Sequence, residues 1–134
     1  MNLDTSTIIA VAAFTSPDRS RIYEYLAGKL KVATETARRE LWGASIRKAG
    51  PVEAAGVEVF MQGVLSIPDR PSLRALSLAI GGEIKATDVQ IFGTGDFWGM
   101  VTTTGDTRFL KAVWTQRRMV FAHWLHQGAT FTGH

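Results

Sequence analysis

The 134-residue sequence contains no cysteine, which excludes disulfides and any metal site or nucleophile built on cysteine. It also lacks an apolar run near the roughly 20 residues that a membrane-spanning helix needs. The longest such run near the N-terminus extends only from Ile8 to Phe14, and no basic segment of the kind found in secretory signals precedes it. These absences predict a cytoplasmic chain with no membrane partner.

Motifs of common enzyme and cofactor sites are missing as well. No serine lies in a nucleophile-elbow context, and Gly93-x-Gly95 lacks the third glycine of a dinucleotide-binding loop. His123 and His126 are three residues apart, but no third ligand is near them in the sequence, so imidazoles at a helix end are the favoured interpretation. Four aspartates lie at predicted turns, namely Asp69, Asp88, Asp96 and Asp106. The sequence therefore predicts no metal, no cofactor and no enzymatic activity.

The formal net charge of +3 is concentrated in one part of the chain. Residues 18–50 hold eight basic and four acidic side chains, whereas residues 51–134 hold seven of each. A basic segment of this kind attracts a polyanion such as nucleic acid. A solvated helix surface with a modest surplus of lysine and arginine is the alternative interpretation.

Apolar residues recur at helical spacing through much of the basic segment. Ser16-Pro17-Asp18 is a typical helix start, and Gly50-Pro51 is a typical stop. One helix over this whole length would be unusually long, and Gly28 lies inside it. Two interpretations stay open: a single long packing helix, or two helices separated by a break near Lys31 to Ala33.

The second half of the chain predicts alternating strands and helices. The expected elements are a strand Val57–Leu65, a helix containing Leu73, Leu76 and Ile80, a hairpin of strands Val89–Phe92 and Phe97–Thr103, a long helix Thr107–His126, and a short edge strand at 129–132. This order is that of a ferredoxin-like βαββα antiparallel sheet with two helices. The predicted fold class is thus α+β, with a helical segment 1–50 followed by an α+β dimerisation domain 51–134.

The predicted final helix has apolar residues on more than half of its circumference, including Trp114, Phe121 and Trp124. One sheet covers only one stripe of a helix, so a second copy of the chain is the simplest cover for the rest. These three residues are therefore predicted to form the interface of a homodimer or larger assembly.

The stretch from Leu26 to Leu41 resembles the helix-turn-helix of bacterial transcription regulators, with the pattern Leu-Ala-x-x-Leu-x-Val-x-x-x-Thr-x-Arg-Arg-x-Leu. The resemblance implies that the following residues contact DNA: Lys31, Thr34, Thr36, Arg38 and Arg39. Gly93-Thr94-Gly95-Asp96-Phe97-Trp98 is similar to the hairpin of leucine-responsive (AsnC-type) regulators. That similarity implies a dimerising domain that binds a small-molecule effector.

These observations together predict a regulatory protein that binds duplex DNA as a dimer. One alternative is a non-enzymatic assembly or interaction protein, for example a phage or plasmid accessory factor, in which residues 18–49 form one packing helix. Another alternative is an RNA-binding sheet on which Phe60, Phe92, Phe97 or Trp98 stack with bases.

Overall fold

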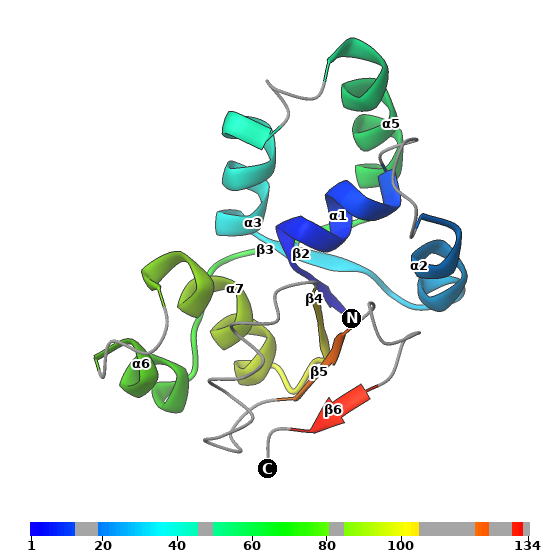
Figure 1. Ribbon diagram of the computed structural model, residues 1–134. Coiled ribbons are helices and arrows are strands. Elements are labelled where there is room, and N and C mark those ends of the chain that lie inside the picture. The colour runs from blue at the N-terminus through cyan, green and yellow to red at the C-terminus, as the bar shows by residue number, and fades with distance from the viewer. Residues whose placement is uncertain (13–18, 46–49, 81–84, 105–119, 124–129, 133–134) are drawn as a thin grey trace.

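The computed structural model describes residues 1–12, 19–45, 50–80, 85–104, 120–123 and 130–132, which form an α/β fold (Figure 1). The strands are β1 Asn2–Leu3, β2 Val32–Thr34, β3 Leu65–Ile67, β4 Thr102–Thr104, β5 Val120–His123 and β6 Thr130–Thr132. The helices are α1 Thr5–Ala12, α2 Arg19–Leu26, α3 Glu35–Glu40, the π-helical turn η1 Leu41–Ser45, α5 Pro51–Met61, α6 Leu73–Ile80 and α7 Ala86–Phe97. Within this part of the chain, no helix combines the length and the apolar character that crossing a bilayer requires.

The six strands form one sheet in the order β3-β2-β1-β4-β5-β6. Strands β3, β2, β1, β4 and β5 are parallel to their neighbours, and only β6 runs antiparallel, beside β5. From β1 the chain continues to β2 and β3 on one side, whereas β4 lies on the other side of β1. The strand order therefore reverses between β1 and β4.

Helices cover the sheet from both sides, as expected when parallel strands are joined by right-handed crossovers. Helix α1 packs against α2 and α5, while α7 contacts β2 and β4 and carries α6 on its outer side (Figure 1). The largest fully buried side chains are Phe92, Leu3, Ile8, Ile22, Leu26, Leu41, Ile91, Val11 and Val89. The core thus lies between β1, α1, α2 and the start of η1, with a second buried set along α7.

Two glycines of α7 allow this helix to lie close to its neighbours. A Cβ atom at Gly93 would lie 2.7 Å from Cβ of Pro71 and 2.8 Å from Cβ of Ala75, and one at Gly95 would overlap Thr102. Real Cβ atoms do not approach other atoms this closely, so only glycine fits at both positions. These glycines therefore mark close packing within a helix, whereas the sequence analysis assigned them to a hairpin turn.

The predicted ferredoxin-like antiparallel fold is wrong, because four of the five strand pairings are parallel. Most of the residues predicted as strand Val57–Leu65 are not extended, because Val57–Met61 form the C-terminal part of α5 and β3 begins only at Leu65. Those predicted as the hairpin Val89–Thr103 form most of α7. Part of the predicted final helix, Val120–His123, is strand β5.

The predicted helix-turn-helix is also wrong, and so is the single long helix. Val32–Thr34 is a buried strand that pairs with both β1 and β3, so it separates α2 from α3 by a passage through the sheet. The resemblance to AsnC-type regulators fails with it, because the second half does not form that family's antiparallel sheet. The predicted segments 1–50 and 51–134 both supply strands to the one sheet. The predicted helix at Leu73–Ile80 and the edge strand at Thr130–Thr132 are confirmed.

Candidate functional site at the carboxyl edge of the sheet

Asp4 follows β1 directly and precedes the first residue of α1. Its side chain is only 7% exposed, and both carboxylate oxygens accept hydrogen bonds. Oδ1 accepts from the backbone N–H of Thr5 at 2.9 Å, and Oδ2 accepts from Oγ of Ser6 at 2.9 Å and from Oγ1 of Thr104 at 2.8 Å. A carboxylate at this position also interacts favourably with the N-terminal end of the helix dipole. The start of α1 therefore fixes a buried acid at the edge of the sheet.

The hydrogen bond from Thr104 to Asp4 joins the carboxyl ends of β1 and β4. These are the two strands between which the strand order reverses. In open α/β sheets the crevice outside the carboxyl ends of the strands at such a reversal is the usual ligand site, because the connections leave it in opposite directions. Topology and side-chain chemistry therefore mark the same place.

A second carboxylate influences the protonation of Asp4. Burial raises the pKa of Asp4 to about 6, against the opposing effect of the hydrogen bonds from Thr104 and Ser6, and the negative charge of Asp88 raises it further. Asp88 lies in the first turn of α7, at the end of the helix that receives acidic side chains favourably. Asp88, on a different element, is thus near enough for its charge to act on Asp4.

A third carboxylate reaches the same region through Thr5. Glu40, the last residue of α3, accepts a hydrogen bond at Oε1 from Oγ1 of Thr5, over 3.1 Å. Thr5 is the neighbour of Asp4, so α3 brings its acidic end to the start of α1. Asp106, two residues beyond β4 in the sequence, lies outside the described residues.

The donor set of this site consists of carboxylate and hydroxyl oxygens, which are the ligands that Mg²⁺ and Mn²⁺ prefer. Among the described residues, no three His, Cys, Asp or Glu side chains lie close enough to share one ion. Mg²⁺ commonly binds through only one or two carboxylates and keeps several waters, some of which substrate oxygens replace. Asp4, with the charge of Asp88 acting on it, is compatible with that mode of binding.

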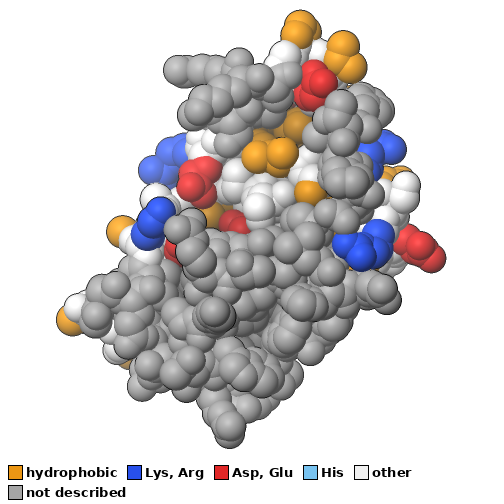
Figure 2. All heavy atoms as spheres, in the orientation of Figure 1, with side chains coloured by type: hydrophobic (Ala, Val, Ile, Leu, Met, Phe, Trp, Pro, Cys, Tyr) orange, Lys and Arg blue, Asp and Glu red, His pale blue; other side chains and the backbone are white. Residues whose placement is uncertain are grey.

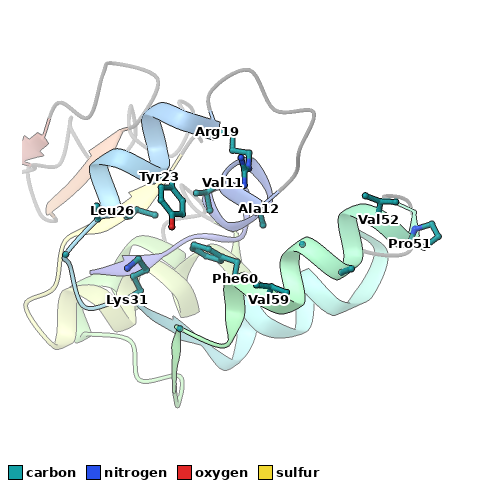
Figure 3. A pocket seen from close by; sticks show the side chains of 15 residues that line it. Val11, Ala12, Arg19, Tyr23, Leu26, Lys31, Pro51, Val52, Val59 and Phe60 are labelled. Atoms are coloured by element: carbon teal, nitrogen blue, oxygen red, sulfur yellow. The ribbon is translucent and has the colours of Figure 1, made fainter.

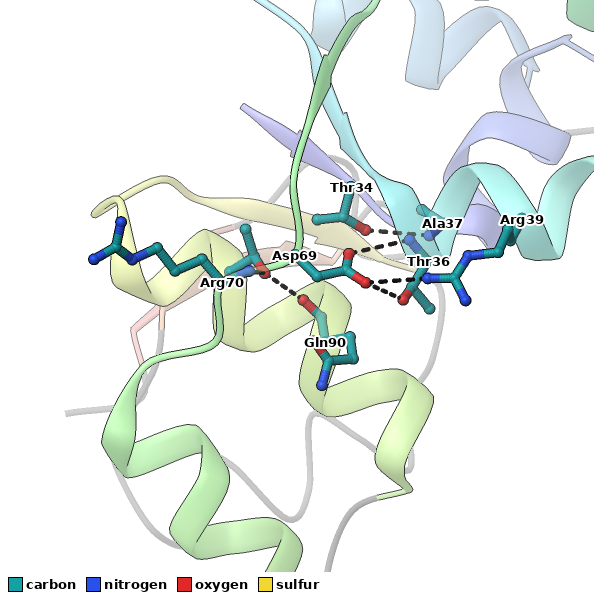
Figure 4. Close-up of polar contacts among 8 residues, drawn as sticks. Thr34, Thr36, Ala37, Arg39, Asp69, Arg70 and Gln90 are labelled. Carbon is teal, nitrogen blue, oxygen red and sulfur yellow. Dashed lines mark hydrogen bonds and ion pairs between the residues drawn. The ribbon is translucent and has the colours of Figure 1, made fainter.

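Asp69, beyond the end of β3, is a structural acid of the same edge (Figure 4). Its carboxylate accepts from the backbone N–H of Thr36 at 3.1 Å, from Oγ1 of Thr36 at 2.6 Å and from Nη2 of Arg39 at 3.4 Å. The neighbouring Arg70 donates its backbone N–H to Oγ1 of Thr94 at 2.8 Å. This loop therefore connects β3 to α3 and α7. The hydrogen bonds of Asp69 assign this residue a structural role.

The residues predicted to contact DNA lie on several elements. Thr34 is fully buried and caps α3, with Oγ1 accepting from the N–H of Ala37 at 3.1 Å, and Thr36 is buried against Asp69. Nη2 of Arg38 donates to the carbonyl oxygen of Val64 at 3.0 Å.

Two of the predicted DNA contacts remain nearer the surface. The side chain of Arg39 is 74% exposed beside Asp69, and Nζ of Lys31 donates to the carbonyl oxygen of Lys29 at 3.1 Å. On the face drawn in Figure 2, Lys and Arg side chains lie among acidic and apolar ones and form no continuous basic surface within the described part. Contact of these five residues with DNA stays a prediction.

The predicted dimer interface falls mostly outside the described residues. Phe121 lies in β5, opposite Phe131 of β6, while Trp114 and Trp124 are not among the described residues. Of the two predicted helix-end histidines, His123 is the last residue of β5 and His126 is not described. The homodimer therefore also stays a prediction.

The sequence analysis missed Asp4, Asp88 and Glu40. The sequence places Asp88 at a turn, whereas it lies in the first turn of α7, and it indicates Glu40 only as one of the charges of residues 18–50. The available signal was Asp4, a single acid directly after Leu3 and four residues before the apolar run that begins at Ile8. An acid in that position is typical of the carboxyl end of a buried parallel strand.

An apolar groove of about 980 Å³ lies elsewhere, between α1, α2 and α5 (Figure 3). Val11, Leu26, Val59 and Phe60 are among its lining side chains, and Arg19 and Lys31 also face it. None of its lining residues is acidic. The groove therefore has the character of a docking surface, whereas the carboxylates define a chemical site.

The fold is similar to a chain in the crystal structure of VapBC2 from Rickettsia felis bound to a DNA fragment from their promoter. The TM-score is 0.65 at 14% sequence identity, and the match covers 90% of this chain and 96% of that chain. A match to the family's sequence model extends over residues 7–133, and the chain therefore belongs to the family described as "Protein of unknown function (DUF1308)".

Proposed function

We propose that this chain is a divalent-cation-dependent phosphodiester hydrolase that acts on nucleic acid at the carboxyl edge of its sheet. The observation that carries the proposal is the buried Asp4, which shares the crevice between β1 and β4 with Asp88 and is linked through Thr5 to Glu40. The negative charge of Asp88 contributes to the raised pKa of Asp4, and a cation bound at Asp4 would offset that repulsion. The sequence analysis predicted no enzyme, and the fold leaves that prediction untested.

Nucleic acid is the proposed substrate because of the net positive charge of the chain and its structural similarity to a complex bound to DNA. The chain has a net charge of +3, with the excess in residues 18–50, and a polyanion is attracted to such a protein. The similar Rickettsia felis complex is bound to DNA, which supports a nucleic-acid substrate here without specifying DNA or RNA.

Asp4, with Asp88 near enough for its charge to act on it, would hold the cation. When bound, the cation supplies charge stabilisation at the phosphate oxygens and lowers the pKa of a bound water. Ser6 and Thr104 hold Asp4 in one orientation, and α1 and the sheet exclude water from behind it. In the hydrolysis a bond forms between the oxygen of water and phosphorus, and the bond from phosphorus to the leaving oxygen breaks.

Glu40 is the residue that we assign to the proton of the attacking water. It is exposed, and Thr5 engages its Oε1, so the carboxylate is oriented while it remains in contact with solvent. A partly solvated carboxylate at this position can accept a proton and release it to bulk water. The leaving oxygen takes its proton from solvent.

The test is cleavage of fluorescently labelled RNA and DNA oligonucleotides in Mn²⁺ or Mg²⁺, followed by gel electrophoresis. We expect cleavage by the wild-type chain, loss with EDTA, and at least 100-fold slower cleavage by Asp4→Asn and by Asp88→Asn, because one lost carboxylate ligand weakens the site. Glu58→Gln on α5 is the matched control and should cleave like wild type, because Glu58 is exposed and far along another element. Cleavage that is equal in Asp4→Asn and wild type would remove the proposal.

A second candidate function is binding of a partner protein in the groove of α1, α2 and α5. The groove combines an apolar lining with Arg19 and Lys31 and no acid, so an amphipathic segment with acidic residues fits it. The similar Rickettsia felis structure is a complex, which supports a protein partner for this chain. Titration with acidic and basic amphipathic peptides of equal length tests this, since only the acidic peptide should bind and Val59→Glu should abolish its binding.

A further inference from the structure

Two exposed aromatic side chains lie at the end of α7, at the opposite end from Asp88. Phe97 is 41% and Trp98 52% exposed, and their rings meet edge to face with centroids 5.0 Å apart. Cζ of Arg70 lies 4.5 Å from the centroid of the Phe97 ring. We refer to Phe97, Trp98 and Arg70 as the aromatic platform.

The backbone beneath the platform is fixed by the end of the helix. The N–H groups of Trp98, Gly99 and Met100 donate to carbonyl oxygens of the last turn, at 3.2, 3.1 and 2.8 Å. Gly99 has a φ of 66°, the left-handed conformation that ends helices and that glycine adopts without strain. The backbone that carries the two rings is thus fixed, so binding would cost the conformational entropy of the side chains but not of the main chain.

Asp96, which precedes the aromatic platform, is also held in place by hydrogen bonds. Asp96 is buried and receives hydrogen bonds from Oγ of Ser72, at 2.5 Å, and from the guanidinium of Arg74. Arg74 is therefore neutralised by Asp96. Arg70, in contrast, forms no ion pair within the described residues, and its charge rests over the face of Phe97.

This combination fits a single-stranded nucleic acid better than an apolar protein surface. A base can stack on an exposed aromatic ring, and an arginine beside the ring can contact the adjacent phosphate. An unpaired guanidinium at the centre of an apolar protein contact would instead lose its hydration without compensation. Duplex bases are already stacked on one another, so the platform favours a strand whose bases are accessible.

The platform and the carboxylate site are connected by rigid elements. Asp88 and Phe97 lie on the same helix, nine residues apart, which corresponds to about 14 Å along its axis. Arg70 follows Asp69, whose hydrogen bonds tie the loop to the start of α3, the helix that ends in Glu40. A strand bound at one end of α7 can therefore extend along the helix toward the other.

We propose that Phe97, Trp98 and Arg70 bind a single-stranded segment of the nucleic acid, by stacking with its bases and contacting its phosphate, while an adjacent phosphodiester lies at the carboxylate site. This inference rests on the proposed function for the identity of the substrate. It assigns the specificity for single strands to the end of α7.

The experiment measures the binding of a fluorescein-labelled 12-nucleotide oligouridylate by anisotropy, with the full chain in EDTA so that no hydrolysis contributes. Trp98→Ala and Arg70→Gln should each raise Kd by about 5- to 150-fold. Trp42→Ala is the matched control for the tryptophan, because Trp42 is 39% exposed on η1. Lys29→Gln, an exposed cation over Tyr25, is the control for the arginine. Both controls should bind within about twofold of wild type.

The outcomes separate this inference from the proposed function. Weaker binding in both platform variants, with normal binding by the controls and little competition from a duplex of equal length, supports the platform even if no cleavage is found. Equal binding by Trp98→Ala and wild type overturns the platform, whether or not the chain cleaves RNA. A shift in sedimentation of Trp98→Ala without a change in Kd would assign the rings to a protein contact and overturn it too. If Trp98→Ala unfolds, Trp98→Phe and Arg70→Gln decide, because the first should retain stacking and the second should lose the phosphate contact.

Discussion

Replacing Asp4 by asparagine should stabilise the protein at neutral pH, although it removes the central acid of the proposed site. The pKa of Asp4 rises from 3.8 in the unfolded chain to about 6 in the folded one. The folded state therefore binds more protons between these two values, and its stability falls as the pH rises through this window. A shift of about 2 units corresponds to ~3 kcal/mol of destabilisation once the carboxyl is fully ionised.

Asparagine has no charge to desolvate, so it avoids this cost at every pH. Asparagine has an NH₂ donor in place of one carboxylate oxygen, but the hydroxyl groups of Ser6 and Thr104 can rotate to accept from it. We assign a loss of ~1 kcal/mol in stability to the less favourable geometry of these hydrogen bonds. The net expectation for Asp4→Asn is a gain of ~2 kcal/mol at pH 8. At pH 4.5, where the folded wild type is mostly protonated, the gain should shrink to near zero.

The assay is urea denaturation in EDTA at pH 4.5 and pH 8, followed by circular dichroism, with Glu58→Gln as the control for removal of an exposed acid. The decisive quantity is the difference in ΔΔG between the two pH values, expected to be about 2 kcal/mol. An Asp4→Asn variant that is less stable than wild type at pH 8, or whose ΔΔG is the same at both values, would refute the reasoning. Asp4 would then be ionised without penalty and no longer a reason to expect a cation.

Three further predictions follow from the same contacts. Mn²⁺ should raise the melting temperature of the wild type at pH 7.5 by several degrees and much less at pH 5, where protons compete for Asp4, and Asp4→Asn should show neither effect in a thermal-shift assay. Gly95→Ala should destabilise the fold by ~1–3 kcal/mol, because its methyl group overlaps Thr102, whereas Gly63→Ala, whose nearest contact is 3.7 Å, should be tolerated in the same denaturation experiment. Asp69→Ala should cost ~1–3 kcal/mol by leaving the backbone N–H of Thr36 and its hydroxyl without an acceptor, measured against the exposed Glu58→Gln.

The sequence identifies the local elements better than their assembly. The stripe of Leu73, Leu76 and Ile80 correctly predicts α6, because helical periodicity is a local property. The strands of the sheet have only two to four residues, too few for any alternation to show. Val57, Val59 and Met61 do alternate, yet they belong to α5, where Val59 is exposed on the groove and Val57 is buried on the opposite side.

The carboxylate site could not be predicted from the sequence for a related reason. Asp4, Glu40 and Asp88 are separated by dozens of residues, and only the parallel order of β1, β2 and β4 brings their elements together. Gly93 and Gly95 led to the wrong prediction of a hairpin turn. The sequence alone does not distinguish a glycine required for close packing from one required for a turn.

The pairing of β1 with β4 has a consequence for the order in which the protein matures. Strand β1 pairs with β2 about thirty residues later, but Asn2 also pairs with Thr102 and Asp4 accepts from Thr104, so its second partner is added only after about a hundred residues. Contacts this distant in sequence are entropically costly and form late. A growing chain on the ribosome can therefore build α1 and α2 early, yet it has no assembled crevice until β4 emerges. A translation product interrupted before β4 therefore lacks the hydrogen bond that holds Asp4 in place.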